Sequence, residues 1–261
     1  MILKIIIFIV LILIIIHYKN YNKSNKDIEI IQLNIYNKEE YDKISNIKQP
    51  IILYDFLKDK DSFNELSFES LKDIDNMKII LNNNSEIFLK EYIEKIEKED
   101  IDISYYENNL ILSYIDLSLD KELKLLVSPL SIYTSKNFTI VPKNYLTPLV
   151  YTSFDKNIFL NYDGLLEFYI YNKKDINNLY FEKKDKIYNV SKIENILDKE
   201  NNNINYPNSK NSNYITIRLY KGQVLILPNN LPYCYKSIEP SLIINSKSET
   251  IFSFIFNLKN I

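Results

Sequence analysis

The sequence predicts a mainly β domain with flanking helices (α+β), built on a jelly roll or a barrel. From Thr139 onward, short runs rich in β-branched and aromatic residues recur, and turn residues such as Asp163-Gly164 separate them. Many short strands at such intervals are typical of jelly rolls and barrels. The expected strands are Leu149–Thr152, Ile158–Asn161, Leu165–Asn172, Tyr214–Tyr220, Val224–Leu227, Ser241–Asn245 and Thr250–Leu258.

An uninterrupted apolar run, Ile5 to Ile16, lies near the start of the chain. It is shorter than the roughly 20 residues of a spanning helix, but Lys4 is able to reach the headgroups. A signal peptide and a buried strand are the alternatives. Because no small-residue cleavage site follows, we expect residues 1–17 to be an uncleaved signal anchor, a single-pass transmembrane helix. The lysines that follow it slightly favour a cytoplasmic domain.

Residues 18–27 are polar and basic and are expected to be a linker. The remainder, 28–261, is expected to be one domain, with an α/β part at about 28–138 and a β core at about 139–258. The elements expected before residue 85 are a strand at Ile28–Tyr36, a helix at Lys38–Ile44 that Asn37 caps, a strand at Pro50–Phe56, a helix beginning at the capping-box pattern Ser62-Phe-Asn-Glu65, and a strand at Met77–Leu81.

Ser85 is expected to cap the clearest helix of the chain. Its apolar residues Ile87, Phe88, Tyr92, Ile93 and Ile96 recur at helical spacing, which predicts an amphipathic helix packed on a sheet. The polar, Asn-rich stretch 182–213 is expected to be a long excursion between strands, with a short helix near Lys192–Leu197.

Composition excludes several classes of function. The net charge of −2 gives no reason to expect a nucleic-acid partner. The lone Cys234 rules out an intramolecular disulfide and a cysteine-based zinc site, and it is expected to be a packed core thiol. Only two glycines are present, too few for a phosphate-cradling loop. The abundance of Ile, Asn, Lys and Tyr indicates an AT-rich genome, and we favour a giant DNA virus as the source.

Two segments carry a resemblance to a known family. Thr147-Pro-Leu-Val-Tyr-Thr152 and Gly222-Gln-Val-Leu-Ile-Leu-Pro228-Asn-Asn-Leu-Pro-Tyr233 resemble the metal-ligand strands of cupin-like, JmjC-type oxygenases. Those strands read [ST]-P-x-H-x-D and G-D-x-x-x-I-P-x-x-W-x-H. The resemblance implies a double-stranded β-helix and descent from Fe(II)/2-oxoglutarate hydroxylases, which hold iron with two His and one carboxylate.

Other segments agree with this resemblance in order and spacing. Asn157 is followed seven residues later by Gly164, and Phe168–Tyr171 supplies an aromatic strand. Upstream, Pro50-Ile-Ile-Leu matches an early strand of the family, and Tyr105-Tyr106 matches a segment that follows a helix. The resemblance therefore covers about residues 28 to 258.

The positions that carry the family's chemistry have all changed. Val150, Thr152 and Tyr233 stand at the former metal-ligand positions, and Leu166 stands where a lysine would bind the cosubstrate. A shifted alignment places Asp155 at the carboxylate position, but the only histidine, His17, lies outside the domain. We therefore expect a pseudoenzyme with no cofactor, no metal and no catalytic residue. The residues expected to line a remaining pocket are Tyr151, Asp155, Asn157 and Phe168.

The expected function is that of a membrane-anchored, catalytically inactive cupin/JmjC-like protein that acts by binding or as a structural component, with an unknown protein partner. The alternative is a membrane-associated enzyme, hydroxylase-like or sugar-processing, that uses carboxylates; a cluster of Asp155, Asp163 and Glu167 would favour it. A third possibility is an unrelated β-rich protein. The many tyrosines of the β region are able to line a sugar or peptide groove, although AT-rich codons also explain them.

Overall fold

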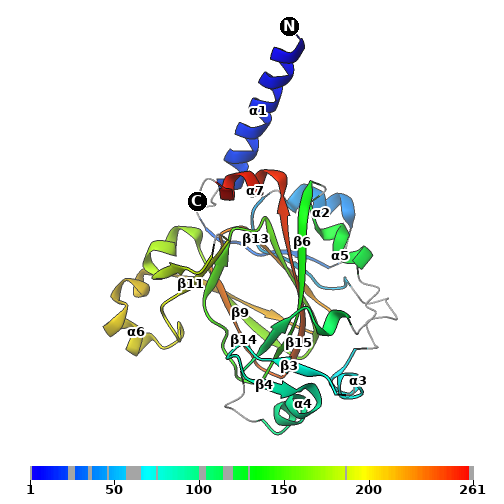
Figure 1. Cartoon of the computed structure of the whole chain (residues 1–261). Coiled ribbons are helices and arrows are strands. Elements are labelled where there is room, and N and C mark those ends of the chain that lie inside the picture. Colours follow the sequence, from blue (N-terminus) through cyan, green and yellow to red (C-terminus); the bar gives the residue numbers. More distant parts are fainter. Residues whose placement is uncertain are drawn as a thin grey trace.

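The computed structural model describes residues 2–22, 27–34, 37–45, 47–56, 66–74, 76–99, 104–113, 120–128, 130–185 and 187–258. Within them the protein is mainly β, with three sheets and a small number of helices (Figure 1). The seven-stranded sheet contains, in spatial order, β1 (Ile31–Leu33), β2 (Ile51–Leu53), β13 (Val224–Pro228), β8 (Lys156–Asp163), β15 (Ser241–Thr250), β6 (Ser131–Val141) and β5 (Tyr106–Asn108). The six-stranded sheet contains β10 (Phe181–Lys183), β11 (Tyr188–Ser191), β7 (Val150–Thr152), β14 (Tyr233–Ser237), β9 (Leu166–Tyr171) and β12 (Tyr214–Leu219).

The order of the strands is that of a jelly roll. Strand β6 pairs with β15, β7 with β14, β8 with β13, and β9 with β12, all antiparallel. The first of these eight strands thus pairs with the last, the second with the last but one, and so on inward, while the chain alternates between the two sheets. A separate hairpin joins β3 (Lys78–Ile80) to β4 (Glu86–Phe88).

Both faces of the seven-stranded sheet are buried, and alternate residues of each strand belong to different cores. Phe159, Leu225 and Ile243 face the six-stranded sheet, and their neighbours on the same strands belong to the outer core. The outer core packs beneath α2 (Lys38–Ser45), α3 (Phe68–Lys72), α4 (Leu89–Glu97) and α5 (Asp120–Leu126), with a 3₁₀ turn at Ile111–Ser113. Burial on both faces explains the continuous apolar runs of β2 and β13.

The outer face of the six-stranded sheet is covered by the excursion that follows β9. It contains the 3₁₀ helices η3 (Lys173–Asn178) and η4 (Pro207–Asn211), with α6 (Lys199–Asn205) on the flank of the molecule (Figure 1). Tyr169, Tyr171 and the fully buried Cys234 pack there against Leu179 and Ile193. Cys234 is thus a core thiol, as the sequence predicts.

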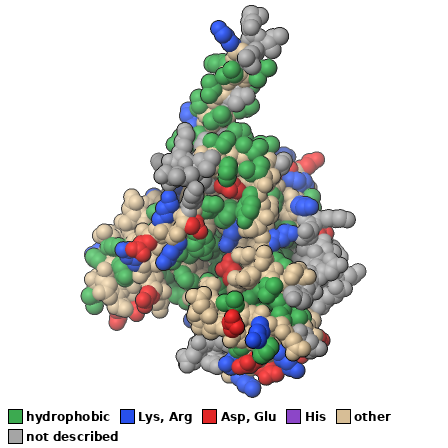
Figure 2. All heavy atoms as spheres, viewed as in Figure 1, with side chains coloured by type: hydrophobic (Ala, Val, Ile, Leu, Met, Phe, Trp, Pro, Cys, Tyr) green, Lys and Arg blue, Asp and Glu red, His purple; other side chains and the backbone are tan. Residues whose placement is uncertain are grey.

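The N-terminal segment requires a correction. Helix α1 (Ile2–Asn22) rises from the body of the molecule with exposed apolar side chains such as Phe8 (Figures 1 and 2). Nevertheless, among the described residues no helix has the length and apolar content needed to cross a bilayer. The expected signal anchor is therefore wrong, and so is the single-pass localisation based on it. The physical reason is that only part of α1 is apolar. Its apolar run Ile5–Ile16 rises only about 18 Å as a helix, against roughly 30 Å of hydrocarbon, and polar residues from His17 to Asn22 make up its end.

The C-terminal segment is also corrected. The alternating run Thr250–Leu258 predicts a strand, but β15 ends at Thr250 and α7 (Ile251–Leu258) follows. The backbone N–H of Thr250 donates to Ser253 Oγ at 2.8 Å, and the backbone N–H of Ser253 donates to Thr250 Oγ1 at 3.2 Å. This reciprocal pair satisfies two amide groups at the start of the helix, so capping overrides the strand-like alternation.

Three expected helix starts also need comment. The Ser62–Glu65 pattern lies outside the described residues, and α3 is capped instead by the reciprocal hydrogen bonds of Ser67 and Ser70. After Ser85 the chain first forms β4, so α4 begins only at Leu89. The helix expected near 192–197 is wrong, because α6 begins after Asp198, whose side chain accepts a hydrogen bond from the backbone N–H of Asn201.

Candidate functional site

Val150 and Tyr233 stand where the resemblance places histidine ligands, and they lie side by side in the structure. Val150 on β7 and Tyr233 on β14 are directly paired across the six-stranded sheet, and both side chains are buried. Leu166, which stands where the resemblance places a cosubstrate-binding lysine, lies on β9 in the same sheet and packs into the apolar core between the sheets. The structure thus brings these positions to one face, and aliphatic side chains occupy two of them.

Thr152, which stands where the resemblance places a carboxylate, is hydrogen-bonded to Asn157. The amide Nδ2 of Asn157 donates to Thr152 Oγ1 at 2.9 Å, and both side chains are buried. The hydroxyl of Thr152 is therefore part of an internal polar pair. Phe168 packs between the sheets, with its ring centroid 5.1 Å from that of Phe159 and 4.8 Å from that of Tyr235. Asn157 and Phe168 thus stabilise the surroundings of the site.

Two residues expected at the pocket lie elsewhere. The ring of Tyr151 packs edge-on against Phe181 of β10, at a centroid distance of 4.7 Å. Asp155 precedes β8 and forms an ion pair with Lys48, with Nζ and Oδ1 3.0 Å apart. Neither residue lines the cavity beside Val150 and Tyr233, and Asn157 and Phe168 are not among its lining residues either. Strand alternation explains Tyr151, because its neighbours Val150 and Thr152 point to the opposite face.

A cavity of about 170 Å³ opens beside the paired Val150 and Tyr233. We call it the tyrosine pocket. Its lining residues come from both sheets and from preceding loops: Asn82, Tyr105, Glu107, Thr147, Pro148, Val150, Phe159, Tyr188, Val190, Tyr233, Tyr235 and Asn245. Sequence reasoning found only Val150 and Tyr233 as site residues. Glu107 and Asn245 carry no local signal, because their part in the pocket depends on pairings between distant strands.

The tyrosines of the pocket are neutral hydrogen-bonding groups. Burial raises the pKa of Tyr233 and of Tyr105 far above the ordinary value of a phenol, and the nearby Glu107 adds to both shifts. The same two causes raise the pKa of Tyr235, and burial followed by the neighbouring Tyr233 raises that of Tyr188. Their hydroxyls therefore keep their protons at physiological pH and are able to donate to a ligand.

The charges at this pocket balance. Glu107 forms an ion pair with Lys247, with Oε1 and Nζ 3.3 Å apart and side chains 18% and 10% exposed. Asn137 Nδ2 also donates to Glu107 Oε1 at 3.2 Å, and Lys247 Nζ lies 5.4 Å from the centroid of the Tyr188 ring. Since the carboxylate is already paired, the pocket offers no free charge to an ionic ligand.

One polar atom of the pocket is left without a partner. Asn245 Oδ1 is buried and has no hydrogen bond in the described part of the chain. Leaving a buried acceptor unsatisfied costs about 1–3 kcal/mol. A ligand that donates a hydrogen bond to Asn245 Oδ1 would remove this cost. The pocket therefore favours a ligand that carries a hydrogen-bond donor.

The structure does not assemble an acidic centre from the carboxylates singled out in the sequence. Asp155 and Asp163 lie at opposite ends of β8, roughly 26 Å apart at the usual rise of a strand. Asp163 Oδ1 is 3.1 Å from Lys221 Nζ, and Glu167 Oε1 is 3.2 Å from Arg218 Nε. Within the described ranges no three His, Cys, Asp or Glu side chains are grouped as metal ligands. The carboxylate-based enzyme hypothesis therefore gains no support from these three residues.

Comparison with known proteins provides no further assignment. No protein-family model and no curated protein matches this sequence. The resemblance to cupin-like oxygenases therefore stays an expectation that rests on sequence motifs alone.

Proposed function

We propose that this protein binds a small, neutral, polyhydroxylated molecule, a monosaccharide, in the tyrosine pocket without chemically changing it. The unpartnered Oδ1 of Asn245 carries the proposal, because it demands a hydrogen-bond donor inside the cavity. Sugar hydroxyl groups are donors, and they also accept hydrogen bonds from the protonated hydroxyls of the surrounding tyrosines.

The size and charge of the pocket support the same class of ligand. Its volume of about 170 Å³ is below the roughly 300–1,000 Å³ of pockets for drug-sized molecules, which favours a single-ring ligand. The ion pair of Glu107 with Lys247 leaves no charge for an ionic ligand to neutralise. The buried tyrosines present aromatic faces and polar tips, the combination that suits a sugar ring.

We also propose that the domain is a divergent, inactive relative of the cupin-like oxygenases. The support is positional, because Val150 and Tyr233 are paired on the two strands that the resemblance assigns to metal ligands. Valine has no atom that binds a metal, and Leu166 is not able to pair with a carboxylate. On this proposal the ligand occupies the former catalytic cavity as a bound molecule.

The test compares Asn245→Leu with Thr139→Val. Each substitution removes a buried oxygen that lacks a hydrogen-bond partner, but only Asn245 lines the pocket. Titration calorimetry with a panel of neutral monosaccharides is expected to detect binding to the wild type and to Thr139→Val, and none to Asn245→Leu. We expect the ligand-free Asn245→Leu variant to be as stable as the wild type or more stable, because the unsatisfied acceptor is gone.

Two results would contradict the proposal. Failure of every neutral sugar to bind the wild type would reject the ligand class. Unchanged sugar binding by a folded Asn245→Leu variant would reject the tyrosine pocket as the site. Urea unfolding of each variant, followed by circular dichroism, establishes that a loss of binding is not a loss of folding.

A further inference from the structure

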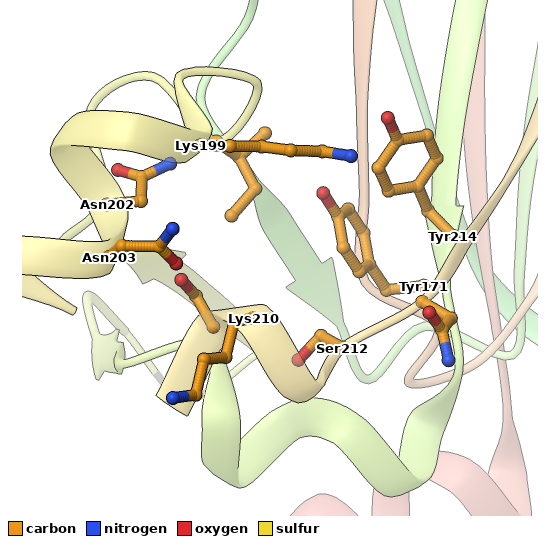
Figure 3. A pocket seen from close by; sticks show the side chains of 10 residues that line it. Tyr171, Lys199, Asn202, Asn203, Lys210, Ser212 and Tyr214 are labelled. Carbon is orange, nitrogen blue, oxygen red and sulfur yellow. The ribbon is translucent and has the colours of Figure 1, made fainter. Parts of the chain in front are cut away.

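A second cavity lies on the outer face of the six-stranded sheet, away from the tyrosine pocket. It has a volume of about 390 Å³ and is enclosed by the sheet on one side and by α6 and η4 on the other (Figure 3). We call it the lysine pocket. Its lining includes Lys199, Lys210, Tyr171, Tyr214 and Ser212. The volume is within the roughly 300–1,000 Å³ that is usual for small-molecule sites.

The lysine pocket has a positive charge. Lys199 and Lys210 contribute two ammonium groups, and no carboxylate is among its lining residues. Neither lysine has an ion-pair partner in the part of the chain that the structure describes. Asp175 is not among the lining residues, and its Oδ2 accepts a hydrogen bond from the backbone N–H of Asn213 at 3.3 Å. An anionic ligand is therefore favoured at this pocket.

The same pocket presents aromatic and polar surface next to that charge. The rings of Tyr171 and Tyr214 have centroids 5.3 Å apart and are inclined by 58°, and Lys199 extends toward them from α6 (Figure 3). Ser212 Oγ is buried without a hydrogen-bond partner among the described residues. Lys210 points away from Lys199 and from the two tyrosines in this view. A ligand that carries a ring is thus able to contact the two tyrosine rings, to hydrogen-bond with Ser212 and to lie close to the Lys199 ammonium group.

We propose that the lysine pocket binds a phosphate monoester carried on a polar ring, as in a sugar phosphate or a nucleoside monophosphate. The phosphate group is placed against Lys199, and the ring against the two tyrosines. Lysine serves as a point charge for phosphate, and an aromatic face supports a sugar or a base. This site is independent of the tyrosine pocket, because it lies on the opposite face of the sheet and recognises a charged ligand.

The test uses the full chain and four probes: glucose 6-phosphate, adenosine monophosphate, glucose and inorganic phosphate. Titration calorimetry is expected to show binding of at least one of the two esters, more weakly at higher salt. Any binding of glucose is expected to be the same in the wild type and in Lys199→Gln. Preference for one ester identifies the ring as sugar or base, whereas phosphate binding as tightly as both esters would overturn the role of the tyrosines.

Substitutions then locate the site. We expect Lys199→Gln to weaken ester binding about tenfold, the equivalent of one lost charge-assisted contact. Lys210→Gln is expected to have a smaller effect. The matched control is Lys90→Gln, which removes an exposed lysine from α4, far from this pocket in Figure 1. Equal affinity in Lys199→Gln and Lys90→Gln would overturn the proposal, as would the absence of any ester binding to the wild type. Thermal unfolding of the variants checks that each remains folded.

Discussion

The seven-stranded sheet buries one lysine on each of its faces, and the two lysines are held by different means. Lys156 of β8 points to the outer core, where its Nζ donates to Tyr41 Oη at 2.9 Å and to the carbonyl of Leu126 at 3.0 Å. Lys247 of the neighbouring strand β15 points to the inner face, where it pairs with the Glu107 carboxylate. The outer lysine donates its hydrogen bonds to neutral acceptors, whereas the inner lysine is paired with a carboxylate.

This difference explains the properties of the two faces. Neutral acceptors compensate only part of the lost hydration of an ammonium group, so burial lowers the pKa of Lys156 to about 8. On the inner face the ion pair removes net charge from the wall of the tyrosine pocket, which leaves its tyrosines and Asn245 to define the ligand. The inner arrangement therefore serves a cavity, and the outer one serves packing.

The largest effect on stability is expected when the inner ion pair of Glu107 with Lys247 is broken. Glu107→Gln leaves the Lys247 charge buried without a counter-ion, and we expect the free energy of unfolding at pH 7 to fall by roughly 3–5 kcal/mol. Urea unfolding measures this change. The double variant Glu107→Gln/Lys247→Met removes both charges and is expected to recover most of the loss.

A surface pair provides the control for that experiment. Glu99 and Lys143 form an ion pair with side chains 59% and 36% exposed, so Glu99→Gln is expected to change stability by less than about 1 kcal/mol. Equal effects of Glu107→Gln and Glu99→Gln would show that the inner pair is not a buried ion pair in solution, and the contrast between the two faces would be lost.

The next largest effect is the pH dependence of the free energy of unfolding that the outer lysine, Lys156, produces. The folded pKa of Lys156, about 8, lies below the value of 10.5 for a free lysine. Between these two pH values the unfolded chain binds one proton more than the folded chain, so raising the pH stabilises the fold. We expect Lys156→Met to lack this rise, and to exceed the wild type at pH 7 by up to about 3 kcal/mol.

The measurement is the difference in unfolding free energy between wild type and Lys156→Met from pH 7 to 10.5. A difference is needed because buried tyrosines such as Tyr233 have a raised pKa, which lowers the stability of both proteins above pH 10. The carbonyl of Leu126 keeps a partner in the variant, since the Tyr41 hydroxyl donates to it at 2.6 Å. A difference that is constant with pH would show that Lys156 is charged in the fold throughout this range.

The sequence predicted the parts of this architecture that have a local signal. Strands β7, β8, β9, β12, β13 and β15 are predicted because β-branched runs and turn residues such as Gly164 delimit them, whereas β10, β11 and β14 are not predicted and Thr250–Leu258 is helical apart from its first residue. Gly164 has φ +83°, and a Cβ there would lie 2.1 Å from the carbonyl oxygen of Pro240, so only glycine is suited to that turn. Strand β6 was missed, since its first half is partly exposed and polar, without the alternation of a half-buried strand.

The candidate site was predictable only in part. Val150 and Tyr233 were placed by motif spacing, and the strand register pairs them. Glu107 and Lys247 are separated by 140 positions in the chain, and no local pattern in either segment indicates that they meet. Asn245 also lacks a local pattern, because nothing near it in the sequence distinguishes it from the many other asparagines of the chain. Residues whose function depends on long-range pairing therefore need the fold before they are recognised.

The smallest effect on stability is expected from substitution of Thr152 on β7. Thr152→Val keeps the shape of the side chain but leaves the buried amide of Asn157 without its partner at 2.9 Å. We expect a loss of about 1–2 kcal/mol in urea unfolding, and recovery in Thr152→Val/Asn157→Leu, where both polar groups are absent. Thr152→Ser keeps the hydroxyl and controls for the change in size. If Thr152→Val were as stable as the wild type, the hydroxyl of Thr152 would be free to serve a ligand. A loss that Asn157→Leu recovers would instead assign Thr152 to the internal support of the inner face, and would leave recognition in the tyrosine pocket to Asn245 and the tyrosines.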